Sequence, residues 1–236
     1  MKKPYEILKN TLSAKPNARI KLLGDSITHG FGGTGYAQDG DSFVEGFARN
    51  TKGYCWANLF KKYMEECFGC TVVINACTGT RIDFIIEHFN TLVDGEDDLV
   101  FCAIGTNNRG VYFEEGYKPS REEMGTGFYN KVVKLYNMFK DAGKEIIFIA
   151  NIPASAANEQ DGATFWRILH MDDINAIYKA AAEKLDFPLI SFYDLFTEYC
   201  ETNDVAIEEL LNDTLHPNDR GYEVMYNLIL KELQLA

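Results

Sequence analysis

The chain has 236 residues, of which 46% are hydrophobic and 25% charged, and its formal net charge is −12 at pH 7. These proportions are typical of a soluble globular protein, and the length suits one α/β domain that buries its own core. The acidic excess argues against binding to nucleic acid or to an anionic membrane, because both require lysine and arginine. The sequence contains no stretch approaching the ~18 apolar residues of a membrane span.

The start of the chain and its cysteines both predict a cytoplasmic protein. Lys2 and Lys3 are followed by no apolar stretch, so a signal peptide is not expected. One of the six cysteines, Cys102, lies in an apolar run that reads as a strand. A long chain without a secretory signal favours free thiols over disulfides. Cys67 and Cys70 form a CxxC pair without a second pair at metal-ligand spacing, so no metal or cofactor is expected.

Apolar runs typical of buried strands alternate along the chain with segments of helical periodicity. The predicted strands are Arg19–Leu23, Thr71–Asn75, Asp98–Ala103, Glu145–Ala150 and Pro188–Phe192. The predicted helices are Tyr54–Glu66, Arg81–Phe89, Arg121–Ala142, Phe165–Leu185 and Asn218–Leu233. Strands that alternate with helices pair in parallel through right-handed crossovers. Because no linker or repeat divides the chain, residues 1–236 are predicted to form a single three-layer α/β domain, a five-stranded parallel sheet with helices on both faces.

Two segments are longer than a simple connection requires. Gly30–Gly53 contains seven glycines and shows little periodicity, and Asn151–Thr164 is rich in small and polar residues. Long loops in compact domains are usually functional or mobile. Loops that follow the carboxyl ends of parallel strands line the ligand crevice of such a sheet. Both segments are therefore predicted to shape a substrate pocket.

Two motifs at opposite ends of the chain carry the residues of a nucleophilic hydrolase. The run Gly-Asp-Ser-Ile-Thr places Ser26 at the end of the first predicted strand, where an α/β enzyme exposes a nucleophile. The run Asp-Thr-Leu-His-Pro places Asp213 three residues before His216, so the carboxylate can hold the imidazole. A held imidazole can take the proton of a serine hydroxyl. Asp194, after the fifth predicted strand, is a weaker candidate for the orienting carboxylate.

An acyl transfer also needs hydrogen-bond donors for the oxyanion. Gly79 follows the second predicted strand, and a glycine there lets a backbone N–H approach a substrate oxygen closely. Asn107 follows the third predicted strand, and its side-chain amide can donate to the same oxyanion. His29, Asn108 and Trp166 are candidate substrate contacts; for His29 and Trp166 the alternatives are a satisfied loop histidine and plain packing.

These blocks, in this order, resemble the SGNH (GDSL) hydrolases, and they extend from residue 20 to about residue 222. The resemblance implies a flavodoxin-like sheet of strand order 2-1-3-4-5. It implies Ser26 as the nucleophile and His216 as the base, oriented by Asp213. It also implies an oxyanion hole formed by the backbone N–H groups of Ser26 and Gly79 and by the side chain of Asn107.

The chain departs from the family pattern in two blocks. The third block usually reads Gly-x-Asn-Asp, whereas Asn108 occupies the last place here, so the carboxylate is lost while the donor Asn107 remains. The second block is commonly Asn-x-Gly-x-x-Gly, and the spacing from Asn75 to Gly79 is one residue shorter. The backbone of a threonine beside Gly79 is therefore an alternative second donor.

Taken together, the motifs predict a serine ester hydrolase that cleaves small O-acyl groups, chiefly acetyl, from a sugar or another polar alcohol. The polar loops favour a hydroxylated substrate. One alternative is a lysophospholipase or thioesterase with a longer acyl slot, and another is a binding protein that keeps the fold without turnover. The predicted partner is a small-molecule ester, with no nucleic acid or membrane, and the oligomeric state stays open.

Overall fold

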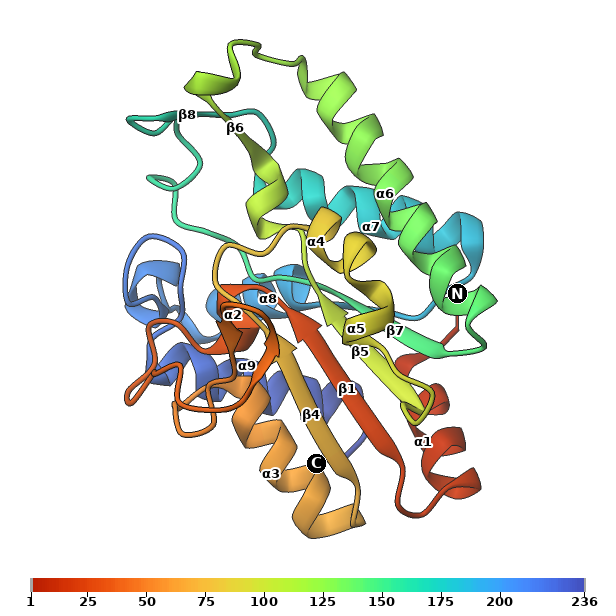
Figure 1. Ribbon diagram of the computed structural model, residues 1–236. Helices are drawn as coiled ribbons and strands as arrows, with labels where there is room; N and C mark the ends of the chain where they lie inside the picture. The colour runs from red at the N-terminus through yellow and green to blue at the C-terminus, as the bar shows by residue number, and fades with distance from the viewer. Residues whose placement is uncertain (1, 236) are drawn as a thin grey trace.

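A five-stranded parallel sheet forms the centre of the protein in a computed structural model that describes residues 2–235 (Figure 1). Its strands are β1 (Arg19–Gly24), β4 (Thr71–Ala76), β5 (Leu99–Ala103), β7 (Glu145–Ala150) and β9 (Leu189–Ser191). The spatial order is β4-β1-β5-β7-β9, and every neighbouring pair is parallel. Counted along the chain, this is the expected 2-1-3-4-5 order, and the predicted fold class is confirmed.

The sheet is buried on both faces, which explains the continuous apolar runs of its central strands. Along β5, the side chains of Leu99, Phe101 and Ala103 enter the core on one face. Val100 and Cys102 enter the core on the opposite face. Because successive residues of a strand point to opposite sides, an apolar residue is needed at every position. Burying a leucine, valine or phenylalanine side chain fully stabilises the fold by about 1.5–3 kcal/mol relative to leaving it exposed.

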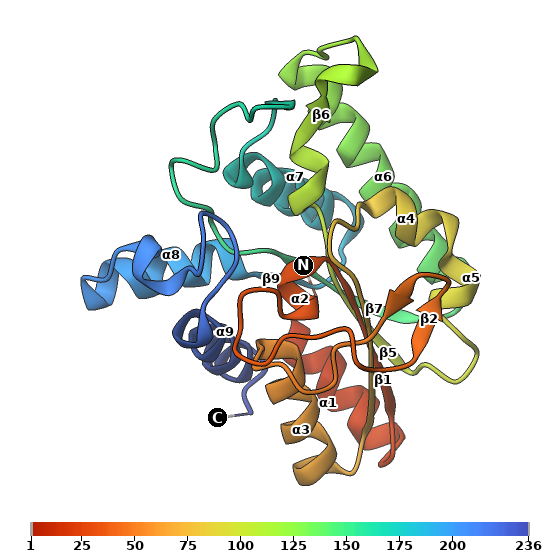
Figure 2. The same ribbon diagram turned by 60° about the vertical axis from the view of Figure 1, so that its left-hand side comes forward.

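Helices cover both faces of the sheet (Figure 2). Four of them pack on one face: α1 (Pro4–Ala14), α3 (Trp56–Phe68), α8 (Phe192–Asn203) and α9 (Asp219–Glu232). Four pack on the other: α4 (Ile82–Glu87), α5 (Phe89–Leu92), α6 (Arg121–Asp141) and α7 (Met171–Leu185). The protein thus has the three layers that the alternating pattern predicts, with α1 and α8 as helices that the pattern did not reveal.

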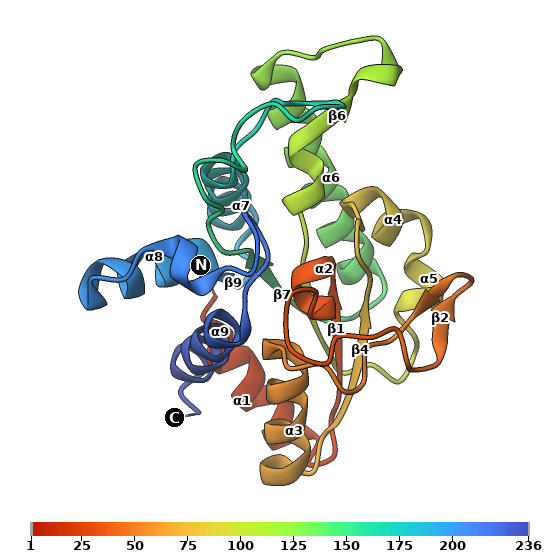
Figure 3. The same cartoon turned by 90° about the vertical axis from the view of Figure 1, so that its left-hand side faces the viewer.

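Short elements surround the carboxyl edge of the sheet. They are the one-turn helix α2 (Ser26–His29), the hairpin of β2 (Ser42–Val44) and β3 (Phe47–Ala48), and the pair of β6 (Gly110–Tyr112) and β8 (Phe165–Arg167). Single 3₁₀ turns occur at Thr106–Arg109, Phe113–Glu115 and Ile207–Leu210. Figures 1 and 3 show β6 projecting beyond the end of the sheet at which α2 lies.

The prediction of a helix from Phe165 to Leu185 is wrong over its first turn and a half. Phe165–Arg167 instead forms β8, which pairs antiparallel with β6, and α7 begins at Met171. Two carboxylates fix that start, because Asp173 accepts a hydrogen bond from the backbone N–H of His170 and Glu159 accepts one from Met171. Satisfying these otherwise unpaired donors defines the end of the helix.

Smaller differences concern the edges of other elements. Phe192 begins α8 rather than ending a strand, and His88 separates α4 from α5 within the single helix predicted there. All six cysteines are free thiols, as predicted. Within residues 2–235, no helix is both long and apolar enough to cross a membrane.

Candidate active site

The turn after β1 presents Ser26 at the carboxyl edge of the sheet. Gly24 permits this tight turn, because a Cβ there would lie 2.3 Å from Oγ1 of Thr28. The Asp25 side chain then caps α2 by accepting a hydrogen bond from the N–H of Ile27 at 3.0 Å. Ser26 is the first residue of α2. Its own N–H consequently has no partner within the helix and remains free to face a ligand.

His216 lies beside Ser26, although 190 positions separate the two in sequence. The distance from His216 Nε2 to Ser26 Oγ is 2.8 Å. On the other side of the ring, Nδ1 lies 2.8 Å from Oδ2 of Asp213. The second oxygen of Asp213 accepts hydrogen bonds from the backbone N–H groups of Leu215 and His216, both at 2.7 Å. The carboxylate therefore cannot rotate without losing these contacts, and it fixes the imidazole.

The negative charge of the Asp213 carboxylate also favours this orientation of the His216 ring. Partial burial alone raises the pKa of this carboxyl, but hydrogen bonds from His216 and Leu215 outweigh burial, and its pKa lies below the ordinary value. The ionised carboxylate keeps a proton on Nδ1, which leaves Nε2 to accept one. The alternative orienter, Asp194, lies on α8, where it accepts from Asn175 and pairs with Lys179.

Two of the three predicted oxyanion donors, Gly79 and Asn107, lie just after the ends of β4 and β5 and line the same pocket. Asn107 Nδ2 donates one hydrogen bond to the carbonyl of Thr80 at 3.0 Å, which orients the amide and leaves its second hydrogen available. Gly79 adopts a φ of +80°, and its N–H has no hydrogen-bond partner within residues 2–235. Both residues line one pocket of about 150 Å³. The N–H of Thr80, an alternative donor, is already bonded to the carbonyl of Cys77.

The three candidate substrate contacts take different positions. His29 is 99% buried, and its Nδ1 lies 3.3 Å from the Tyr36 hydroxyl and 3.5 Å from that of Thr78. Burial lowers the pKa of His29, which favours the neutral ring. Within residues 2–235, the buried Nε2 of His29 has no hydrogen-bond partner. The backbone of Ala48 acts in the opposite direction to burial and raises the pKa of His29.

Asn108 and Trp166 point away from the pocket that Asn107 lines. Asn108 Oδ1 accepts from the N–H of Ile82, and its Nδ2 donates to Asp83, so both ends of the amide hold the start of α4. Trp166 packs against Phe113 with ring centroids 4.8 Å apart. Its neighbours in β8, Phe165 and Arg167, line the pocket instead, as the alternation of a strand requires.

A buried polar network that the sequence did not reveal lies beneath the turn that carries Ser26. Asp25 is fully buried, and its Oδ2 accepts a hydrogen bond from Asn151 Nδ2 at 3.0 Å. The same nitrogen lies 2.8 Å from the Thr106 hydroxyl, just before Asn107 in the chain. Burial raises the pKa of Asp25 to about 6, even though hydrogen bonds from Thr106 and Ile27 oppose the rise. The network therefore links the Ser26 turn to the Asn107 turn.

Arg109 ties further loops to this network. It is fully buried, and its Nε donates to the carbonyl of Thr106 while Nη1 and Nη2 donate to Glu159 and Asn158, both at 2.7 Å. Asn158 in turn donates to the hydroxyl of Thr214, which lies between Asp213 and His216 in the chain. Burial lowers the pKa of Arg109 to about 10, which leaves it charged at neutral pH. The loop after β7 thus positions residues of the site.

A serine hydroxyl, an imidazole and a carboxylate in single file, with backbone and amide donors beside the hydroxyl, are typical of hydrolases that use a serine nucleophile. Within residues 2–235, no group of three or more histidine, cysteine or acidic side chains is arranged to hold a metal ion. The parallel three-layer fold and this file of side chains are together those of the class of hydrolases with an α/β fold.

The model of the GDSL-like lipase/acylhydrolase family matches residues 22–224. The chain belongs to this family, which makes it a carboxylic ester hydrolase acting on small-molecule esters. A comparison with curated protein sequences found no match.

Solved structures share the fold over nearly the whole chain. A catalytic mutant of Axe2, an acetylxylan esterase from Geobacillus stearothermophilus, is 20% identical with a TM-score of 0.66, covering 92% of this chain and 94% of that one. LAE5, an alpha/beta hydrolase from the metagenome of Lake Arreo in Spain, is 19% identical with a TM-score of 0.67, covering 92% and 95%. A putative GDSL-like lipase from Parabacteroides merdae is 16% identical with a TM-score of 0.65, covering 93% and 97%.

Proposed function

We propose that the protein hydrolyses short O-acyl esters, chiefly acetyl esters, of a sugar or another polar alcohol. Ser26 is the nucleophile, His216 the general base and Asp213 the residue that orients it. The observation that carries the proposal is the continuous contact from Asp213 Oδ2 through the imidazole to Ser26 Oγ, with both distances at 2.8 Å. These distances lie within the range that proton transfer requires.

In the first half of the reaction, Ser26 Oγ attacks the ester carbonyl carbon while His216 Nε2 takes its proton. Asp213 stabilises the imidazolium that forms. The negative charge on the former carbonyl oxygen is met by the backbone N–H groups of Ser26 and Gly79 and by Asn107 Nδ2. The tetrahedral intermediate collapses, the alkoxide leaves, and His216 returns the proton to it.

In the second half, a water molecule replaces the departed alcohol. His216 Nε2 takes a proton from this water as its oxygen attacks the acyl carbon, and the same donors stabilise the second oxyanion. Collapse of this intermediate releases the carboxylic acid and breaks the bond to Ser26 Oγ, which recovers its proton from His216. The cycle consumes one water and needs no other reactant.

The size of the pocket beside the oxyanion donors supports a short acyl group. Its volume is about 150 Å³. Its lining includes the polar side chains of Arg81, Asn107 and Arg167. A long acyl chain needs continuous apolar lining, since each buried CH₂ contributes about 0.8 kcal/mol. The shared fold of Axe2, an acetylxylan esterase, favours an acetylated carbohydrate.

Replacing the nucleophile and the base tests the mechanism. With 4-nitrophenyl acetate as substrate, Ser26→Ala and His216→Ala should each lower kcat by at least ~10³-fold, and the double variant should be no worse, because such residues act as a unit. Thermal melting of each variant, compared with the wild type, checks that the fold persists. A Ser26→Ala enzyme that retains wild-type turnover removes Ser26 from the mechanism. A wild type that binds esters without turnover supports the binding-protein alternative.

A series of 4-nitrophenyl esters tests the acyl length. We expect kcat/KM to fall steeply beyond about four acyl carbons, where additional CH₂ groups no longer find apolar surface to cover. Acetylated xylo-oligosaccharides then test the alcohol. A kcat/KM that rises from acetate through octanoate contradicts the short-acyl assignment and favours a lysophospholipase or thioesterase.

A further inference from the structure

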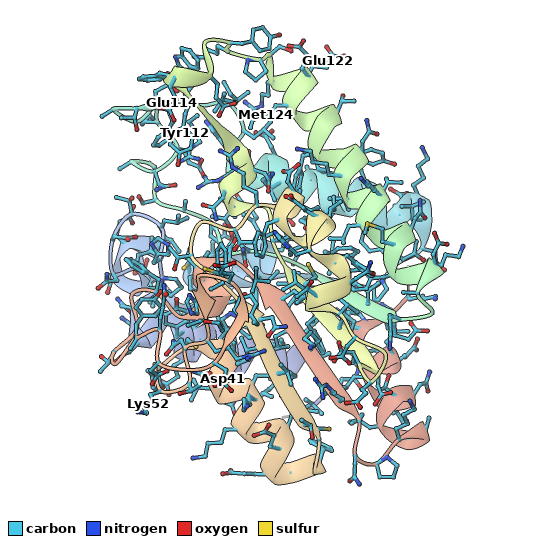
Figure 4. All side chains as sticks on the ribbon, in the orientation of Figure 1. Asp41, Lys52, Tyr112, Glu114, Glu122 and Met124 are labelled. Carbon is cyan, nitrogen blue, oxygen red and sulfur yellow. The ribbon has the colours of Figure 1, made fainter. Side chains whose placement is uncertain are left out.

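The pocket next to the oxyanion donors contains two arginines from different elements. Arg81 comes from the loop between β4 and α4, and Arg167 comes from β8. The same pocket is lined by Gly79 and Asn107, so a group bound in it lies close to the carbonyl that these donors face. Figure 4 labels Tyr112, another lining residue, beside β6 at this end of the molecule.

Neither guanidinium is neutralised by an ion pair. Arg81 donates to the carbonyl of Gly110 at 3.3 Å and Arg167 to the carbonyl of Asn158 at 3.1 Å. Within residues 2–235, no carboxylate oxygen lies within 4.0 Å of either guanidinium. Each guanidinium has five N–H donors, so most of them remain available to a ligand.

Two carboxylates, those of Glu159 and Asp161, influence the charge of Arg167 without forming an ion pair with its guanidinium. Glu159 and Asp161 attract Arg167 at longer range, which partly offsets the burial that lowers its pKa. Glu159 accepts from Arg109 at 2.7 Å, whereas Asp161 accepts from the backbone N–H of Arg167 at 2.6 Å and lies 3.6 Å from Lys118. Neither carboxylate forms an ion pair with the guanidinium of Arg167, which therefore remains available to an anionic ligand.

Aromatic rings hold both guanidiniums in place. Arg81 lies 5.8 Å from the ring centroid of Tyr112, and Arg167 lies 4.7 Å from that of Phe165. A cation over an aromatic face is stabilised without being neutralised, in contrast to a cation in an ion pair. The stacking also limits the conformational freedom that a ligand must remove on binding.

The overall charge of the protein makes this pocket distinctive. The chain carries 35 acidic against 23 basic residues, so its general field repels anions. Arg81 and Arg167 take part in none of the 15 ion pairs found between side chains of residues 2–235. Two unpaired guanidiniums beside the oxyanion donors create a local field of the opposite sign.

We propose that this pocket selects esters that carry a carboxylate a few bonds from the scissile carbonyl, with Arg81 and Arg167 as the specificity-determining residues. Guanidinium groups recognise carboxylates through paired, charge-assisted hydrogen bonds. The proposal rests on the ester hydrolysis proposed above and adds the substrate class. The carboxylate belongs either to the acyl group or to the alcohol, and the two arms of the test distinguish these sources.

The test compares each carboxylate ester with its uncharged carboxamide isostere. The acyl arm uses monoethyl succinate against ethyl succinamate, and the alcohol arm uses 4-carboxyphenyl acetate against 4-carbamoylphenyl acetate. In one arm, the wild type should show a kcat/KM at least about tenfold higher for the carboxylate, the effect of a hydrogen bond to a charged group. Because the attraction is electrostatic, the preference should shrink as NaCl is raised.

Variants assign the preference to the two arginines. Arg81→Gln and Arg167→Gln should each lower the carboxylate-to-carboxamide ratio by about tenfold. Arg121→Gln is the matched control, because it removes the same charge from an exposed arginine that pairs with Asp173, and it should keep the ratio of the wild type.

The outcomes separate this inference from the proposed function. Equal kcat/KM for carboxylate and carboxamide in both arms, or a wild-type ratio in both pocket variants, overturns the anionic-substrate inference while ester hydrolysis stands. A wild type that cleaves none of these esters, nor 4-nitrophenyl acetate, overturns both. The comparison of carboxylate and carboxamide esters, and its salt dependence, can be measured on the wild type alone. The inference can therefore be refuted even if a variant fails to fold.

Discussion

The adjacent asparagines Asn107 and Asn108 offer a sharp test, because the structure gives them different tasks. Asn107→Ala removes one of the proposed oxyanion donors, and the loss of such a donor typically lowers kcat by 10²–10³, or about 2.7–4 kcal/mol in the transition state. Its hydrogen bond to the Thr80 carbonyl is also lost, but Asn107 is only partly buried, so the cost in stability should be small.

Asn108→Ala should produce the opposite result. Asn108 is 93% buried, and its Oδ1 satisfies the N–H of Ile82 at the start of α4, at 2.9 Å. Leaving that donor unpaired should cost about 1–3 kcal/mol of stability. For a domain of this size, 1 kcal/mol corresponds to a shift in Tm of roughly 2–4 °C, so we expect a fall of about 2–12 °C.

The assay measures kcat, KM and Tm for both variants with 4-nitrophenyl acetate, well below the lower Tm. Asn107→Ala should lose kcat with little change in KM or Tm, whereas Asn108→Ala should lose Tm and keep most of its kcat. If Asn108→Ala loses more kcat than Asn107→Ala at equal folded fraction, the oxyanion donor has been assigned to the wrong asparagine.

Two further predictions concern metal and pH. Activity should survive dialysis against EDTA, because His216 takes the serine proton directly; loss with recovery on added zinc or manganese contradicts this mechanism. Burial raises the pKa of Asp25 from 3.8 to about 6, so the folded state binds the proton more tightly and this group costs stability as pH rises through that range. In urea titrations, the free energy of unfolding of Asp25→Asn minus that of the wild type should therefore rise from pH 4 to pH 8, by up to about 3 kcal/mol; a difference independent of pH refutes it.

The sequence was sufficient to predict the sheet because its strands are buried on both faces. Such strands must be apolar at every position, as β5 is, and that signal survives without knowledge of tertiary contacts. The glycine before the first motif carries comparable information. A Cβ at position 24 would lie 2.3 Å from Oγ1 of Thr28, so Gly24 marks a tight turn. Ser26, Asp213 and His216 could be predicted as a set because local patterns at strand and helix ends single them out, and the structure brings the three side chains into contact.

Other features depend on contacts between distant segments and leave no local pattern. Phe165–Arg167 looks like part of a helix until its pairing with β6 is known. The departure at Asn108 is explained only by Asp83, whose carboxylate lies 3.2 Å from the Asn108 amide. An aspartate at that position would place two carboxylates in contact, which costs stability. Arg109 likewise gave no sequence signal, because two of its three side-chain partners, Glu159 and Asn158, come from another loop.

The closure of the site across 190 residues has a consequence for biosynthesis. Ser26 follows the first strand of the sheet, whereas His216 precedes the last helix, α9. Contacts of such long sequence separation form late, since they close a large loop. The emerging chain can thus pair β1 with its neighbours on the ribosome while Ser26 still lacks its contact with His216. Esterase activity consequently reports completion of the fold, and in a refolding experiment it should return after the helical signal.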